Sequence, residues 1–159
     1  MSLLCLLSSP SCYAKLQVEI DAAIAAGRLS SPARNAEADA LPYLQAVIRE
    51  ALRKYPPGTG PFTKVVPEGG DFIQGYYLPA GTELAINICG ITHQKEIFGD
   101  DVGVFRPERW LEKEDAGGAR LRKMVNTVNM VFGGGKNTCP GKLLALTEIN
   151  KVLVEVSPP

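Results

Sequence analysis

Residues 132–141, Phe-Gly-Gly-Gly-Lys-Asn-Thr-Cys-Pro-Gly, carry the strongest chemical signal of the chain. The segment predicts a glycine-rich loop that brings Cys139 to the start of an apolar helix. Pro140 is expected in the first helical turn, where its missing N–H costs nothing. Unpaired backbone N–H groups and the positive end of the helix dipole favour a thiolate there. Because glycines let a flat group approach closely, such a thiolate is suited to bind iron.

The same glycines could instead form a phosphate-binding loop or a flexible turn. A phosphate loop requires Gly, four residues and then Gly-Lys-Ser/Thr. Met130 stands where the first glycine belongs and Asn137 where the Ser or Thr belongs. The phosphate-loop alternative therefore fails at two positions.

The loop resembles the cysteine-ligand loop of the cytochrome P450 superfamily, the haem-thiolate monooxygenases. That loop has the pattern Phe-x-x-Gly-x-x-x-Cys-x-Gly, whose four fixed positions are filled here by Phe132, Gly135, Cys139 and Gly141. The resemblance implies that Cys139 is the axial ligand of the iron of haem b, with Phe132 beside its sulfur. It also implies that Gly135 and Gly141 shape the loop. Asn137 departs from the family, which usually carries a basic residue there for a haem propionate.

Residues 39–55 predict an amphipathic helix. Pro42 lies in its expected first turn, and apolar residues recur at every third or fourth position: Leu44, Val47, Ile48, Ala51, Leu52 and Tyr55. Glu50 and Arg53 lie one helical turn apart. On an exposed surface such an ion pair contributes only ~0.3–0.5 kcal/mol.

A resemblance changes the interpretation of this pair. The helix is similar to the Glu-x-x-Arg helix of the cytochrome P450 family, in which the pair is buried and joined by a second arginine. Residues 107–110, Pro-Glu-Arg-Trp, are similar to the family's Pro-Glu-Arg-Phe segment. The resemblance therefore implies a buried network of Glu50, Arg53 and Arg109 that braces the cysteine loop.

The remaining elements indicate a mainly α fold with a small β-sheet (α+β), in one partial domain over residues 1–159. Periodicity predicts helices at 11–26 and 140–156 and β segments between 62 and 88. The residues of the first helix expected to face the core are Leu16, Ile20 and Ile24. The charged, glycine-rich stretch 112–123 predicts a solvent-facing connection.

Two further residues are assigned by resemblance alone. Lys64 occupies a position where family members often carry an arginine that reaches a haem propionate. His93 lies in a segment that the family builds as a helical turn, and it is a second candidate for a propionate contact. An exposed lysine on a strand and a histidine with a purely structural role are the ordinary alternatives for these two positions.

Composition excludes several classes of function. Seventeen basic residues balance seventeen acidic ones without a basic stripe, which argues against a nucleic-acid partner. The four cysteines form no Cys-x-x-Cys pair and, with one histidine, no zinc-site pattern. The sequence shows neither a membrane span nor a secretory signal. Because eukaryotic family members are commonly anchored to the endoplasmic reticulum, the location stays open.

By resemblance, the expected activity is insertion of one oxygen atom from O₂ into a small organic substrate. Electrons would come from an NAD(P)H-dependent reductase. The resemblance covers nearly the whole chain, but the chain covers only part of the family's usual length, and the family's distal helix would lie before Ser2. Two alternatives remain open: a haem-binding remnant without catalysis, and an interaction domain without a cofactor.

Overall fold

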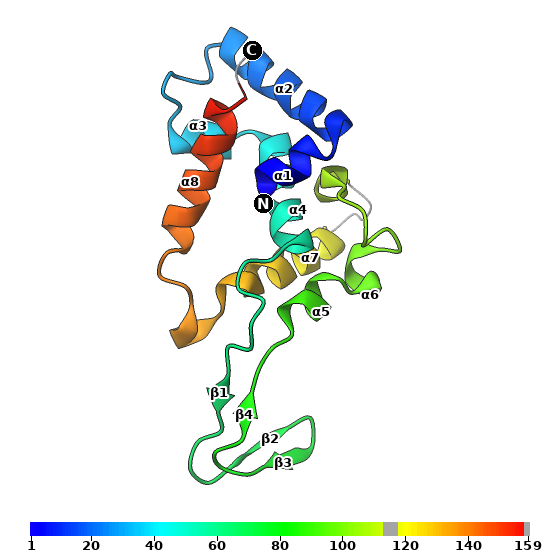
Figure 1. Ribbon diagram of the computed structural model, residues 1–159, viewed down its shortest axis with the longest axis vertical. Coiled ribbons are helices and arrows are strands. Elements are labelled where there is room, and N and C mark those ends of the chain that lie inside the picture. Colours follow the sequence, from blue (N-terminus) through cyan, green and yellow to red (C-terminus); the bar gives the residue numbers. More distant parts are fainter. Residues whose placement is uncertain (113–117, 158–159) are drawn as a thin grey trace.

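A computed structural model describes residues 1–112 and 118–157, and it confirms a mainly α fold with a small β component (Figure 1). The α-helices are α1 (Ser2–Leu7), α2 (Pro10–Ala25), α3 (Asn35–Asp39), α4 (Pro42–Lys54), α5 (Ile88–Thr92), α6 (Lys95–Phe98), α7 (Ala119–Asn129) and α8 (Lys142–Glu155). Three short 3-10 turns are η1 (Pro107–Trp110), η2 (Met130–Phe132) and η3 (Gly135–Asn137). The strands are β1 (Lys64–Val65), β2 (Asp71–Ile73), β3 (Tyr76–Leu78) and β4 (Glu83–Leu84).

Helix α4 is the element around which the others assemble, because it contacts α1, α2, α3, α7, α8 and η1. Pro42 opens the helix at its first position, and the chain leaves it at Tyr55, just before two prolines. The predicted range 39–55 began too early, since Asp39 ends the separate helix α3. Tyr55 is exposed rather than part of the apolar face.

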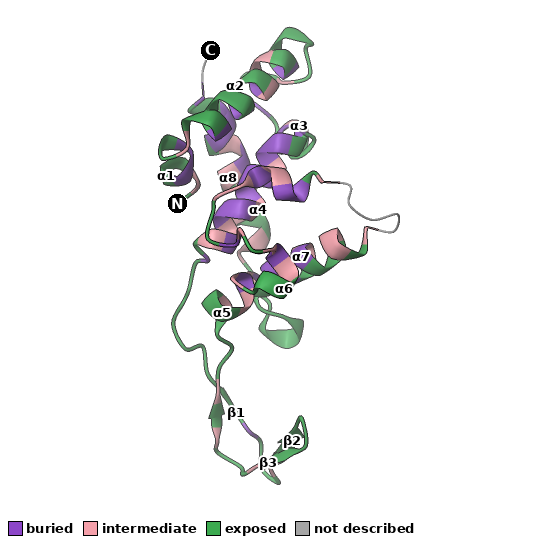
Figure 2. Cartoon of the chain, turned by 90° about the vertical axis from the view of Figure 1, so that its right-hand side faces the viewer, coloured by how far each residue is buried: buried purple, intermediate pink, exposed green. Residues whose placement is uncertain are grey.

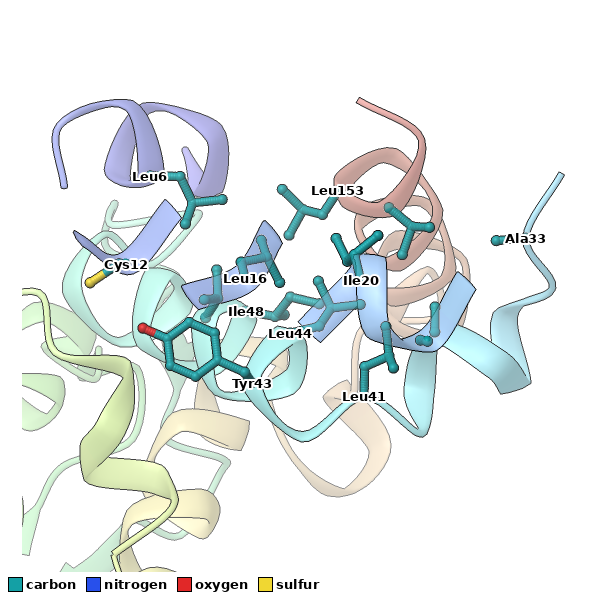
Figure 3. Close-up of a cluster of buried hydrophobic side chains, with 14 residues drawn as sticks. Leu6, Cys12, Leu16, Ile20, Ala33, Leu41, Tyr43, Leu44, Ile48 and Leu153 are labelled. Atoms are coloured by element: carbon teal, nitrogen blue, oxygen red, sulfur yellow. The ribbon is translucent and has the colours of Figure 1, made fainter. Parts of the chain in front are cut away.

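The larger hydrophobic core lies between α1, α2, α4 and α8 (Figure 3). Leu16 and Ile20 are fully buried as predicted, but Ile24 is 47% exposed and Ala23 is buried in its place. The reason is rotational: at about 100° per residue, Ala23 lies about 20° from Leu16 around the helix axis and Ile24 about 80° away. Glu19 of α2 accepts hydrogen bonds from the backbone N–H groups of Tyr43 and Leu44, at 2.8 and 2.9 Å. This carboxylate satisfies the open N-terminus of α4.

A smaller core joins α4 to α6, η1 and α7 through six buried residues: Ala46, Phe98, Val102, Trp110, Met124 and Val128. The prediction of a solvent-facing connection over 112–123 is wrong from Ala119 onward, where α7 begins. Leu121, Met124 and Val128 lie three and four positions apart and give the helix an apolar face on this core. Residues 113–117 of the predicted connection lie outside the described residues.

The β segments project from the helical body and are mostly exposed (Figures 1 and 2). They form two separate antiparallel pairs, β1 with β4 and β2 with β3. Gln74 and Gly75 both have positive φ, 52° and 86°, which suits the two-residue turn between β2 and β3. The predicted β segment near residue 88 is wrong, because Asn87 accepts a hydrogen bond from the N–H of Gly90 and caps α5.

The start of α3 depends on one ionised carboxylate. Glu37 accepts hydrogen bonds from the backbone N–H and the hydroxyl of Ser30, at 2.9 and 2.7 Å, and from the backbone N–H of Arg34 at 3.0 Å. These bonds, led by the one from the Ser30 N–H, lower the pKa of Glu37 to about 2. Since they stabilise the charged form, the folded state holds the proton more weakly than the unfolded chain.

We therefore expect Glu37→Gln to remove a contribution to stability that is present above pH 4.5 and lost as the pH falls to about 2. Urea unfolding of the wild type and the variant between pH 2 and 7 measures the difference. The difference in the free energy of unfolding between the wild type and the variant should decrease steadily as the pH falls. Glu148→Gln, at an exposed site of α8, is the matched control, and an equal pH profile for both variants would contradict the assignment.

Candidate functional site

The cysteine loop runs from the end of α7 through η2 and η3 to the start of α8. It is closed by a hydrogen bond from the N–H of Cys139 to the carbonyl oxygen of Phe132, at 2.7 Å. Phe132 is buried, while residues 133–140 are exposed, Cys139 included. The loop therefore holds a free thiol in an open position on a closed backbone ring.

Helix α8 begins later than the sequence predicts. Gly141 is its N-cap and Lys142 its first residue, so Pro140 precedes the helix instead of lying in its first turn. A proline disfavours helical geometry in the residue before it, and glycine is accepted as an N-cap, which together delay the start. Cys139 lies just outside the helix, and its carbonyl oxygen accepts a hydrogen bond from the N–H of Lys142 at 3.3 Å.

The three consecutive glycines of the loop are not equivalent. A Cβ atom on Gly133 would lie 2.5 Å from the carbonyl oxygen of Asn137, and its φ of 72° with ψ of −167° is a conformation that only glycine adopts readily. A Cβ on Gly134 would meet nothing within 4 Å, nor would one on Gly135, whose φ is 56°. At Gly141 it would lie 3.9 Å from the Cys139 sulfur, an ordinary contact. Gly133, which the sequence motif does not single out, is thus the sterically required glycine.

The structure brings Glu50, Arg53 and Arg109 into direct contact, all with fully buried side chains. Arg53 donates two hydrogen bonds to the Glu50 carboxylate, at 3.0 and 2.8 Å. Nε of Arg109 lies 3.1 Å from both carboxylate oxygens. Opposite charges and a two-pronged geometry make this a strong form of ion pair.

Two further donors on Glu50 were not predicted. The indole N–H of Trp110 donates to one oxygen at 2.9 Å, and the backbone N–H of Arg106 to the other at 3.0 Å. The first contact had a signal in the sequence, because a buried tryptophan usually finds a partner for its N–H. The second contact, from the backbone of Arg106, could not be predicted from the sequence, because every residue but proline carries a backbone N–H.

Other N–H groups of the two arginines donate hydrogen bonds to backbone carbonyl groups of nearby chain segments. Arg53 donates to the carbonyl oxygens of Thr92 and Val104, and Arg109 to those of Phe98, Asp101 and Val104. Arg109 also pairs with the Asp101 carboxylate at 2.9 Å. Partial burial alone would raise the pKa of Asp101, but hydrogen bonds from Arg109 and Arg106 outweigh it and lower that pKa below its usual range.

Helix α4, which carries Glu50 and Arg53, also contacts α7 and α8, the two helices that flank the cysteine loop. On one side α7 packs against it through the smaller core. On the other side Gln45 of α4 donates to the buried Asn150 of α8 at 2.8 Å, and Asn150 donates to Asn35 of α3 at 3.1 Å. The buried network and the loop are thus linked through one helix, α4.

Within the described residues, Lys64 and His93 form no hydrogen bond or ion pair with the cysteine loop or with the Glu50 network. Lys64 is exposed on β1, opposite Leu84. Nδ1 of His93 lies 3.0 Å from the carbonyl oxygen of Cys89, one turn earlier. In the described part of the chain neither residue has a hydrogen bond or ion pair to the cysteine loop, and their roles stay predictions.

Within residues 1–112 and 118–157, no group of three or more His, Cys, Asp or Glu side chains is arranged to hold a metal ion. The donor set at the loop is a single soft thiol, which suits a metal that arrives with most of its ligands already in place, as haem iron does. In the same described part of the chain, no helix combines the length and apolar character needed to cross a bilayer.

Glu50→Gln should lower the free energy of unfolding by ~3–5 kcal/mol, because it leaves two buried guanidinium groups without their carboxylate. Trp110→Phe removes one donor but keeps both ion pairs, so we expect a smaller loss of ~1–3 kcal/mol. Urea denaturation followed by circular dichroism measures both. Glu83→Gln, on exposed β4, is the control, and equal losses for Glu50 and Glu83 would contradict the network's importance.

Gly133→Ala should open the loop, while Gly134→Ala should leave it closed. The added methyl group collides with the Asn137 carbonyl only at position 133, where positive φ also costs energy. Native-state hydrogen exchange of the Cys139 amide reports on closure, and we expect it to accelerate by about tenfold or more in Gly133→Ala. Equal exchange rates in the two variants would refute this steric account.

Known proteins resemble this chain over nearly its whole length. Residues 1–156 match the family model for cytochrome P450. The chain is 46% identical over 156 residues to the cytochrome P450 monooxygenase ABA1 of Pyricularia oryzae, covering 98% of this chain and 30% of that protein. It is 44% identical to the cytochrome P450 monooxygenase ACRTS1 of Alternaria alternata, covering 95% of this chain and 39% of that protein.

A more distant relative is the pisatin demethylase of Fusarium vanettenii, which is 36% identical over 154 residues, covering 95% of this chain and 28% of that protein. The chain thus spans roughly a third of the length of the curated relatives it matches. The family model nevertheless matches almost all of its residues. This chain belongs to the cytochrome P450 family.

Proposed function

We propose that this chain forms the haem-thiolate part of a monooxygenase, in which Cys139 is the axial ligand of the iron of haem b. The observation that carries the proposal is the exposed Cys139 thiol on a loop closed by the hydrogen bond from its own N–H to Phe132. An accessible thiol on a fixed backbone can meet a metal without reorganising the chain, which lowers the entropic cost of binding.

The surroundings of the thiol fit a flat apolar cofactor. Leu143 and Leu144, early in α8, are 78% and 64% exposed and offer apolar surface close in sequence to Cys139. Lys64 and His93 are proposed to contact the haem propionates, since each offers a cation or a hydrogen-bond donor for a carboxylate.

The residues of this chain would act by holding the ligand rather than by moving protons. Cys139 supplies the thiolate, Phe132 fixes its backbone through the carbonyl group, and Gly133 permits the turn. Glu50, through Arg53 and Arg109, stiffens the helix to which both limbs of the loop are attached. When bound, thiolate-ligated haem supplies the activation of dioxygen for insertion of one oxygen atom into an organic substrate, with the second atom leaving as water.

The complete reaction is proposed for a polypeptide of the relatives' length. There it would draw two electrons from an NAD(P)H-dependent reductase and act on a small organic substrate. The name of the pisatin demethylase, a 36% identical relative, supports that substrate class. For the 159-residue chain, haem binding without turnover is the second candidate, because it covers only 28–39% of the relatives named above.

The test is to add haem to the purified chain, reduce it under carbon monoxide and record the absorption spectrum. We expect a thiolate-type spectrum in the wild type and its loss in Cys139→Ser. Cys89→Ser removes the other exposed thiol and should change nothing, which makes it the matched control. A wild-type spectrum that survives Cys139→Ser, or no haem uptake at all, would overturn the proposal.

Assays for oxygen insertion with the reductase present separate the two candidates. A thiolate-type spectrum without product supports haem binding alone for this chain. Product formation that requires Cys139 supports a working monooxygenase.

A further inference from the structure

Lys142 makes an unusual set of contacts for the first residue of a helix. Its ammonium group lies 5.2 Å from the centre of the Phe132 ring and 3.1 Å from the side-chain oxygen of Asn129. Its backbone N–H donates to the carbonyl oxygen of Cys139 at 3.3 Å. This half-buried residue thus touches the cysteine itself, the first residue of the loop and the last residue of α7.

The charge of Lys142 is poorly placed for its own helix. A cation in the first turn of α8 opposes the positive end of that helix dipole. Asn129, however, is the last residue of α7, where the carbonyl groups carry partial negative charge and favour a cation. The side chain therefore reaches back across the loop to a position where its charge is stabilising.

The ring of Phe132 provides a second stabilising contact for the ammonium group of Lys142. A cation over an aromatic face is attracted by the negative charge of the ring surface. Phe132 is also the residue whose carbonyl oxygen accepts the loop-closing hydrogen bond from Cys139. Holding its ring and the end of α7 therefore holds the acceptor of that bond.

We propose that Lys142 is a positioning residue that clamps the cysteine loop shut by pinning Phe132 and Asn129 to the start of α8. Its importance for the metal ligand rests on the proposed function, but the clamp itself is a property of the chain without haem. The clamp and the proposed function are therefore tested by different measurements, and either one can fail without the other.

The clamp is tested in the haem-free chain by native-state exchange of the Cys139 amide. Lys142→Met keeps the length of the side chain but removes its charge, and we expect exchange to accelerate roughly five- to fiftyfold, from the loss of one cation–ring contact and one hydrogen bond. Lys142→Arg keeps both kinds of contact and should stay near the wild-type rate. Lys136→Met removes the same charge from an exposed site in the same loop and should have little effect.

Asn129→Ala provides a second route to the same answer if Lys142→Met folds poorly. It should accelerate exchange in the same direction by a smaller factor, and its effect should not add fully to that of Lys142→Met, because both remove one shared contact. Unchanged exchange in Lys142→Met, or an equal acceleration in Lys136→Met, would overturn the clamp.

The consequence for the ligand is measured in the haem-loaded chain under carbon monoxide. Lys142→Met should convert a larger share of the complex to a non-thiolate spectrum than the wild type or Lys142→Arg. If the wild type binds haem without Cys139, the proposed function fails while the exchange result stands. If Cys139 binds haem but Lys142→Met changes neither exchange nor spectrum, the clamp fails alone.

Discussion

The carboxylate of Glu50 is the interaction on which the structure depends most. A buried carboxylate without partners would be too costly to keep, and this one receives hydrogen bonds from Arg53, Arg109, Trp110 and the backbone of Arg106. The two arginines in turn satisfy carbonyl groups between residues 92 and 104. This stretch is therefore held by charge as well as by Phe98 and Val102, which belong to the smaller core.

This arrangement matters for the cysteine loop because the loop lies at the surface between two helices that α4 contacts. Its residues 133–140 are exposed, and the hydrogen bond from the N–H of Cys139 to Phe132 closes a loop whose ends are set by α7 and α8. Both helices are attached to α4, one through apolar packing and the other through Gln45 and Asn150. The ends of the loop are thus held in place by contacts that lie outside it.

The parts that could be predicted from the sequence are those whose signal is local. The period of α4 and the spacing around Cys139 need no knowledge of the rest of the chain, and the contact of Glu50 and Arg53 follows from one helical turn. Helix α7 was missed because charged residues surround its apolar positions. The collision at Gly133 depends on a carbonyl group four residues away, which comes close only after the loop has closed.

The position of Trp110 has a practical consequence. It is the only tryptophan in the chain, and its ring is buried beside Phe98 with its N–H on Glu50. Indole emission is sensitive to the polarity and hydrogen bonding around the ring, so the fluorescence of this protein reports from a single point. That point is the centre of the charge network, and the chain therefore carries its own optical probe of whether the network is intact.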